Sequence, residues 1–399
     1  MKIIGILSSK LDAEYLYCLS VVFALGLLFF ANADQQEDPT GATIQLGIGK
    51  SFYFPCGVAL ITSFFLKKRS NQTHIVFIWM ICLALVSSLI HPPLKSSGFL
   101  SWTLTRFVLA ILCFKDVSNV NPFLLSKLCA IVSPFIVFPH YILTNPFLYG
   151  ALRYGGFYGD ANFFALSLLL VMVMCYITII HEKSVIVKLL CWSSIIGSIP
   201  LVVFTMSRGG IIGLGVILYF LMVSLRRDNK KLFFLFIVLS IFSISSVRTE
   251  FADLFSFIGS RFSNDNDSDS YSTMARFYGI QSGINVLLNC PYLIPFGIGL
   301  GNTVPAIKLY AAYGYFYRAE IHNTFISLLY EGGLIIFLLY VSIYFRIFFS
   351  LVKGKNYVLL GLLFSTALSL FTLPGVSFMP GWISLFFLSN KHFLVRNHI

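Results

Sequence analysis

Two arginines in the second half of the chain lie beside glycines and next to apolar runs. Arg208 stands in "FTMSRGGIIGLGV", followed by Gly209 and Gly210, and Arg276 stands in "TMARFYGIQSGINVLL". Arginine forms bidentate hydrogen bonds to phosphate oxygens, and a glycine-flanked helix start presents free N–H groups. The Arg208 stretch therefore suits an anionic ligand. Arg276 shares a face of a predicted helix over 273–288 with Gly279 and Gly283, and this small-residue face can lie close to a partner or substrate. Another face of the same helix is an apolar stripe formed by Met274, Phe277, Ile280, Ile284 and Leu287. The structural alternatives are a snorkelling arginine for Arg208 and an interfacial helix on lipid headgroups for Arg276.

Two further positions that could do chemistry lie in "AEIHNTFISLLYEGG", residues 319–333. His322, followed by Asn323, stands at the edge of an apolar run, where a neutral histidine can accept a proton from a hydroxyl. Glu331 lies inside the run, where a carboxylate is costly, so it is expected to support the site or to pair with a buried polar group. A purely structural role is the alternative for His322.

All of these positions border long apolar segments. The chain has 399 residues, of which 57% are hydrophobic and 11% charged, and runs long enough to cross roughly 30 Å of hydrocarbon recur throughout. We therefore predict an all-α polytopic membrane protein with about twelve transmembrane helices. The predicted spans lie near 15–32, 47–66, 75–91, 99–114, 123–143, 163–181, 186–206, 210–225, 232–247, 323–345, 356–373 and 379–390.

The distribution of Lys and Arg predicts the orientation of these spans. Taking loops alternately, one side holds 17 of the 28 Lys and Arg residues and the other holds 9. The positive-inside rule then places both termini in the cytoplasm. Residues 1–247 would form transmembrane helices 1–9, residues 248–321 a large extracytoplasmic loop with amphipathic helices, and residues 322–399 helices 10–12.

Several other features have structural interpretations. Asp160 precedes the sixth span in "LRYGGFYGDANFFALSL", and Asp160 or Asn162 is expected to cap that helix. The acidic run 264–270 departs from an EF-hand loop at its glycine and glutamate positions, so we interpret it as a solvated loop and expect no metal site. Seven of the eight cysteines lie within predicted spans, so a disulfide framework is not expected. The formal charge of +12 follows the topology, and we expect no nucleic-acid partner.

The order of the motifs resembles the O-antigen polymerase and O-antigen ligase superfamily. The resemblance rests on "GGFYGDANFFAL" before a span, "SRGGIIGL" opening a span, an arginine in the large loop, "GIGLGN" later in that loop, and "HNTFISLLYEGG" leading into the next span. These motifs cover roughly residues 150–345, and the predicted topology extends the resemblance to the whole chain.

This resemblance implies a GT-C-like glycosyltransferase on the periplasmic face of a bacterial inner membrane. The donor would be an oligosaccharide linked to undecaprenyl diphosphate, with no cofactor, metal or nucleotide sugar. By position, Arg208 and Arg276 match the family's arginines that grip the lipid diphosphate, and His322 matches the histidine that activates the acceptor hydroxyl. The resemblance also implies residues that support this site: Glu331, Asn323, Gly209, Gly210 and Asp160.

Three functions follow from the resemblance and the sequence. We favour an O-antigen polymerase, which joins lipid-linked repeat units in lipopolysaccharide biosynthesis and could work with a chain-length regulator protein. A ligase, which transfers the finished glycan to lipid A-core, shares the same motifs. A lipid-linked glycan flippase is the alternative of another class. It predicts ionisable residues deep in several spans, whereas the motifs here gather on one side.

Overall fold

The computed structural model describes residues 10–29, 36–37, 43–44, 51, 53–66, 72–90, 98–143, 154–156, 160–224, 267–303, 321, 323–371, 379–390 and 392–393. Side chains are described within these ranges except at 10–12, 36–37, 43–44, 72–73, 98–103 and 267–276.

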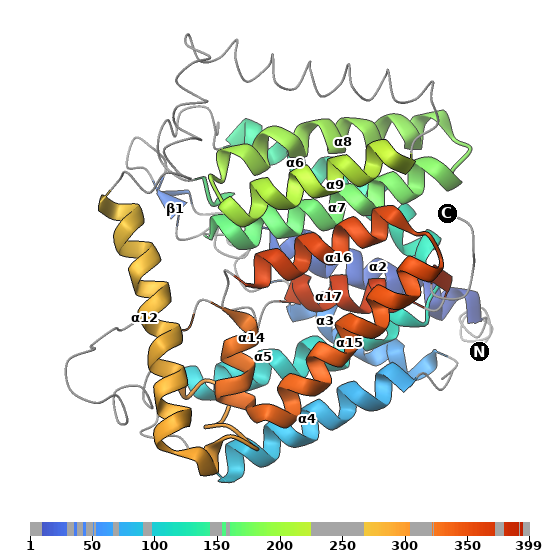
Figure 1. Ribbon diagram of the computed structural model, residues 1–399. Helices are drawn as coiled ribbons and strands as arrows, with labels where there is room; N and C mark the ends of the chain where they lie inside the picture. Colours follow the sequence, from blue (N-terminus) through green and yellow to red (C-terminus); the bar gives the residue numbers. More distant parts are fainter. Residues whose placement is uncertain are drawn as a thin grey trace.

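Helices make up nearly all of this part of the chain (Figure 1). Two short strands, β1 (Gln36–Glu37) and β2 (Thr43–Ile44), pair antiparallel with Gln36 opposite Ile44. The short non-α turns within the described ranges are η2 (Lys115–Ser118), η5 (Pro291–Leu293) and the π-helical η6 (Leu328–Gly332). The α-helices are α2 (Lys10–Leu28), α3 (Tyr53–Phe65), α4 (Gln72–Ile90), α5 (Gly98–Phe114), α6 (Pro122–Leu143), α7 (Ala161–His181), α8 (Val185–Phe204), α9 (Arg208–Ser224), α12 (Asp267–Asn289), α14 (Thr324–Ser327), α15 (Gly333–Lys353), α16 (Tyr357–Leu370) and α17 (Met379–Leu388).

The predicted helical architecture is confirmed for the described residues. Every predicted span except 232–247, which lies outside them, coincides with a helix. Among the described residues, four helical segments are long and apolar enough to cross a membrane by length and composition: Pro122–Leu143, Ala161–His181, Val185–Phe204 and Thr324–Lys353. Six further apolar helices are shorter. Length and composition thus indicate a membrane protein, while a count of twelve spans stays a prediction.

Helix α7 forms the centre of the bundle. It contacts α6, α8, α9, α16 and α17, and its side chains from Phe164 to Thr178 are buried without interruption. A helix that is apolar on every face can be enclosed on every face, because no side of it requires water. This central position explains why the most apolar segment of the described chain faces protein rather than the surroundings.

Small residues set the packing of α9 against its two main neighbours. A Cβ added at Gly210 would lie 2.6 Å from Ala165 Cβ, and one at Gly213 would lie 2.8 Å from Leu169 Cδ1. Helices α7 and α9 therefore run in the same direction in close contact. Ser365 on α16 donates a hydrogen bond to the Gly213 carbonyl oxygen (2.9 Å), and Gly361 contacts Phe220, so α16 runs opposite to α9. Close approach at small residues is the usual means of packing apolar helices.

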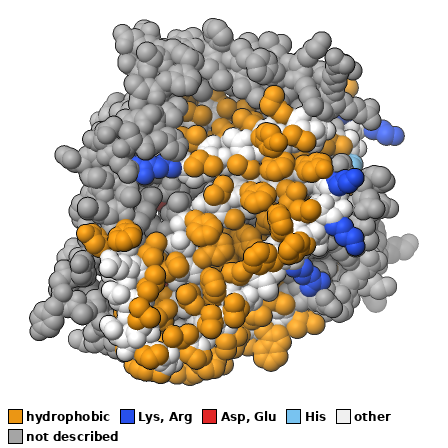
Figure 2. Space-filling model, in the orientation of Figure 1, with side chains coloured by type: hydrophobic (Ala, Val, Ile, Leu, Met, Phe, Trp, Pro, Cys, Tyr) orange, Lys and Arg blue, Asp and Glu red, His pale blue; other side chains and the backbone are white. Residues whose placement is uncertain are grey.

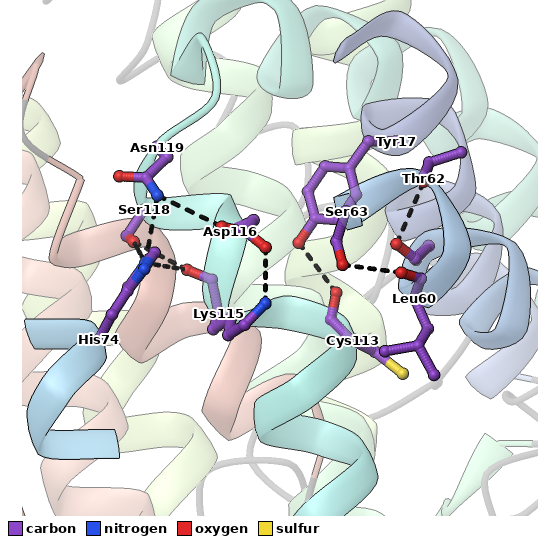
Figure 3. Close-up of polar contacts among 11 residues, drawn as sticks. Tyr17, Leu60, Thr62, Ser63, His74, Cys113, Lys115, Asp116, Ser118 and Asn119 are labelled. Atoms are coloured by element: carbon purple, nitrogen blue, oxygen red, sulfur yellow. Dashed lines mark hydrogen bonds and ion pairs between the residues drawn. The ribbon is translucent and has the colours of Figure 1, made fainter. Parts of the chain in front are cut away.

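A polar network around η2 marks one end of the bundle (Figure 3). His74 Nε2 lies 2.8 Å from Ser118 Oγ and 3.0 Å from the Lys115 carbonyl oxygen. The Asp116 carboxylate pairs with Lys115 Nζ at 2.8 Å and accepts from Asn119 Nδ2 at 3.3 Å. These contacts join the start of α4 to the end of α5.

The start of α2 and the residues after α17 reach the same end of the bundle. The Asn121 N–H donates to Glu14 Oε1 (2.5 Å), and Asn390 Nδ2 donates to the carbonyl oxygens of Val117 and Val120. We call this end, defined by residues 115–121 and their contacts, the η2 end. Figure 1 shows that α12 lies across the opposite, left-hand end of the bundle.

Large apolar side chains cover the outside of the bundle. On the face in Figure 2, hydrophobic side chains fill the middle, and the Lys and Arg side chains lie toward its margins, mostly on the right. Phe135 on α6 and Phe349 on α15 are 74% and 63% exposed. Exposed apolar surface on this scale is unfavourable in water and suits contact with lipid.

Candidate active site

Arg208 is the first residue of α9, directly after a tight turn from α8. Its side chain is partly exposed. Ser207 caps the helix, because its Oγ accepts from the Gly210 N–H at 3.1 Å and its carbonyl oxygen accepts from the Ile211 N–H at 2.8 Å. The predicted helix start is confirmed. Gly210 packs against Ala165 on α7.

Asp160 caps α7, as predicted. Its carboxylate accepts hydrogen bonds from the backbone N–H groups of Asn162 (2.8 Å) and Phe163 (3.1 Å). These N–H groups have no partner inside the helix, and a negative charge is favourable at the positive end of the helix dipole. Asp160 thereby fixes the helix start that lies at the same end of the bundle as Arg208, since α7 and α9 are parallel.

Arg276 lies on α12, about two helical turns before Gly283. A Cβ at Gly283 would lie 2.8 Å from Ile321 Cδ1 and 3.8 Å from the Tyr330 ring, so the small-residue face of α12 packs against the segment that carries Glu331. The apolar stripe predicted on α12 is only partly buried, because Phe277 is 63% exposed. Residues 267–270, predicted as a solvated loop, form the first turn of this helix instead.

The motifs "GIGLGN" and "EGG" fold directly onto each other. The N–H groups of Ile298 and Gly299 donate to the carbonyl oxygens of Tyr330 and Glu331 at 3.0 and 2.9 Å. Gly297 (φ +70°) and Gly333 (φ +81°) lie where their backbones meet, and a Cβ on either would overlap backbone atoms of the other segment. Only glycine combines a positive φ with so close an approach.

Glu331 lies within the π-helical turn η6 and is 5% exposed. Its carboxylate accepts a short hydrogen bond from the Thr303 hydroxyl. Ser87 near the end of α4 donates to the carbonyl oxygens of Phe296 and Glu331, which ties both segments to the bundle. Glu331 thus pairs with a buried polar group, as the sequence predicts, and π-helical turns are frequent at functional sites.

The structure places Asn323 at the start of α14, where its Oδ1 accepts from the Ile326 N–H at 3.0 Å. His322 lies outside the described residues, between Ile321 and Asn323, and the side chain of Arg276 lies outside them as well. Asn323 is therefore a helix cap that fixes the backbone immediately after His322.

The elements that carry the predicted site residues converge on one end of the bundle. Because α16 runs opposite to α9, the end of α16 lies near the start of α9. The ring of Phe371, directly after α16, lies 4.6 Å from the ring of Phe325 in α14. Helix α12 contacts α14 and η6. Arg208, Asn323 and the α12 backbone thus belong to the end opposite the η2 end.

Two residues of this region were not found from the sequence. Thr303 and Ser87 fix Glu331 and the glycine-rich loop, yet each is a common hydroxyl residue in an ordinary context. Thr303 directly follows "GIGLGN", and this adjacency is the only signal that could have indicated it. In the part of the chain that the structure describes, no group of three His, Cys, Asp or Glu side chains is placed to hold a metal ion.

Comparison with known proteins identifies one family. Residues 192–341 match the family described as O-antigen ligase. The match confirms the resemblance to the O-antigen polymerase and ligase superfamily, and it contains Arg208, Arg276, Asn323 and Glu331. No curated protein matches the chain.

Proposed function

Proceeding from the match of residues 192–341 to the O-antigen ligase family, we propose that this chain is an O-antigen polymerase. It would join oligosaccharide repeat units carried on undecaprenyl diphosphate at the periplasmic face of the inner membrane. The observation that carries the proposal is the convergence of the elements bearing Arg208, Arg276 and Asn323 at one end of the bundle. A chain-length regulator is the partner that this function would call for.

The proposed reaction is a direct displacement at the anomeric carbon of the donor glycan. The hydroxyl of the acceptor sugar loses its proton to His322 and forms the new glycosidic bond. The bond between the anomeric carbon and the diphosphate oxygen breaks, and undecaprenyl diphosphate leaves with the electron pair. Arg208 and Arg276 stabilise the charge that develops on the diphosphate through bidentate hydrogen bonds, which replaces a metal ion in this role.

The proposed topology has twelve spans in the GT-C manner, both termini in the cytoplasm, and the loop 248–321 in the periplasm. The two-ended arrangement of the described helices supports it. Contacts of Glu14 and Asn390 gather at the η2 end, and the site elements gather at the other end. The chain would form one integral membrane unit, in which the loop lies over the periplasmic ends of the helices. Its three parts would be residues 1–247, 248–321 and 322–399.

A ligase is the second candidate, since the matched family carries the description O-antigen ligase and supports both functions equally. Both enzymes remove a glycan from undecaprenyl diphosphate, so Arg208 and Arg276 would stabilise the same leaving group in either reaction. They differ in the acceptor, which is a lipid-linked repeat unit for the polymerase and lipid A-core for the ligase.

Lipopolysaccharide gels of a deletion strain separate these functions. The deletion should leave a single repeat unit on core if the chain is a polymerase, whereas a ligase deletion should leave bare core and lipid-linked long chains. Complementation with His322→Ala or Arg208→Ala should not restore the ladder. Arg346→Ala is the matched control, since Arg346 is exposed on α15 away from the site elements. A full ladder from both site variants would refute the proposed mechanism.

A further inference from the structure

The turn that leads into Arg208 has an unusual backbone. Met206 adopts φ 49° and is buried, although it is not a glycine. Thr205 Oγ1 donates to the Val202 carbonyl oxygen (2.6 Å) and accepts from the Ser207 N–H (3.2 Å). A left-handed conformation at a bulky residue persists only where surrounding contacts hold it, and such residues often lie at functional sites.

Tyr154 supplies a contact that holds this turn from outside. Its backbone N–H donates to the carbonyl oxygen of Phe204, the last residue of α8, at 3.1 Å. Its hydroxyl lies 2.9 Å from Nδ1 of His140, which directly follows Pro139 near the end of α6. Both side chains are fully buried. Tyr154 therefore links the ends of α6 and α8.

An aromatic enclosure fixes the pair formed by His140 and Tyr154. The ring of Phe164 on α7 lies 4.7 Å from the His140 ring and 5.7 Å from the Tyr154 ring. Gly156 (φ +54°) lies so close that an added Cβ would be 3.0 Å from His140 Cε1. The enclosure leaves Tyr154 little freedom, so its backbone N–H has a defined position relative to Phe204.

We infer that Tyr154 is a positioning residue for Arg208, with His140 holding Tyr154 in place through its hydroxyl. The connection runs from His140 to the Tyr154 backbone, to the Phe204 carbonyl oxygen, and through the buried turn at Met206 to the first residue of α9. This inference rests on the proposed function, in which Arg208 grips the diphosphate. Neither His140 nor Tyr154 contacts substrate in this scheme.

The first measurement is hydrogen–deuterium exchange of a peptide covering residues 201–210 in the full-length protein in nanodiscs. Tyr154→Phe removes only the hydroxyl and should raise exchange in this peptide. Tyr141→Phe is the matched control, because the Tyr141 hydroxyl also joins α6 to α8, by donating to the Gly197 carbonyl oxygen at 2.5 Å. Unchanged exchange in Tyr154→Phe, or an equal rise in Tyr141→Phe, would overturn the inference.

The second measurement is equilibrium binding of undecaprenyl diphosphate to the same preparations. Tyr154→Phe should weaken binding by ~5-fold, a usual effect of losing one hydrogen bond, whereas Tyr141→Phe should weaken it less than ~2-fold. In an Arg208→Ala background the effect of Tyr154→Phe should nearly vanish, because the two residues act as one unit. Equal weakening in both backgrounds contradicts the inference. If Arg208→Ala alone leaves binding unchanged, the proposed function fails, and the exchange experiment decides the role of Tyr154 in the turn.

Discussion

Glu331 illustrates how a single buried carboxylate is held in an apolar element. Its hydrogen bond from Thr303 comes from a loop that is remote in sequence and adjacent in space. A carboxylate that is almost fully buried depends strongly on each donor, because water does not replace a lost hydrogen bond there. The donor hydroxyl should therefore matter more than the size of the residue at position 303.

Thr303→Val tests this dependence, since it keeps the shape of the side chain and removes the hydroxyl. We expect a loss of ~1.5–3 kcal/mol, the range for a hydrogen bond to a charged group, seen as a lower melting temperature in detergent. Thr303→Ser keeps the hydroxyl and should remain close to wild type. Equal destabilisation by both substitutions would show that packing, rather than the hydrogen bond, is important at this position.

Glu182, between α7 and α8, gives a prediction about pH. A hydrogen bond from Lys127, at 2.6 Å, and backbone N–H groups of Ser184 and Lys183 lower the pKa of this carboxyl from 4.5 to about 2. A depressed pKa means that the ionised form stabilises the fold above pH 4.5 and that this contribution is lost as the pH falls toward 2. Melting temperatures between pH 6 and pH 3 should fall less in Glu182→Gln than in wild type. Parallel curves for the two proteins would contradict this assignment.

Local chemistry is the part of the site that sequence predicts well. The cap at Asp160 follows from an acidic residue directly before an apolar run, because capping involves only the next three residues. The sequence predicts that Glu331 pairs with a buried polar group, but it does not predict that this group is the Thr303 hydroxyl. That partner depends on how loop 294–303 folds onto residues 330–334, which local patterns do not encode.

The contact between the loop 294–303 and η6 depends on two glycines rather than on side chains. Gly297→Ala would place a methyl group against the Glu331 carbonyl oxygen in a backbone conformation that alanine rarely adopts. We expect at least ~2 kcal/mol of destabilisation and loss of glycan polymer in the gel assay. Gly215→Ala on α9 is the control, since nothing lies within 4 Å of its added Cβ. Normal polymer from Gly297→Ala would contradict the tight contact.

Helix α12 shows what periodicity can and cannot predict about an element. The sequence predicts a helix over 273–288, and the structure extends it to Asp267–Asn289. Periodicity also predicts an apolar stripe, yet Phe277 and Ile284 on that stripe are exposed, whereas Gly279 and Gly283 are buried. The small-residue face packs inward because it allows α12 to approach Ile321 and Tyr330 closely.

The two ends of the whole molecule should lie on opposite sides of the membrane. Tyr292→Cys, at a residue 67% exposed after α12, should react with a membrane-impermeant maleimide in intact cells whose outer membrane has been permeabilised. Lys183→Cys, exposed between α7 and α8, should react only after the inner membrane is opened. Both variants need Cys82 and Cys290 replaced by serine, because these two cysteines are not buried. Labelling of Lys183→Cys in intact cells would invert the proposed orientation.

Sequence predicts the segments of the bundle better than their arrangement. Hydropathy locates helices such as α7 and α16 because each is a continuous apolar run, and this property is local. It gives no reason to place α7 in the centre with α9 and α16 against it, because lipid-facing and protein-facing apolar residues look alike. Contacts such as Ser365 with Gly213, across 152 positions, are visible only in three dimensions.

The enclosed position of α7 has a consequence for biosynthesis. Helices α16 and α17 cover part of α7, and they are made long after it. At a usual rate of synthesis the ribosome needs roughly 10–40 s to extend the chain from the end of α7 to the end of α17. If α7 enters the bilayer as it is made, lipid contacts during this interval a surface of α7 that α16 and α17 cover in the finished protein. These lipids must leave when α16 and α17 pack against α7. A nascent chain that stops before residue 357 would therefore keep part of α7 exposed to lipid and accessible to membrane proteases.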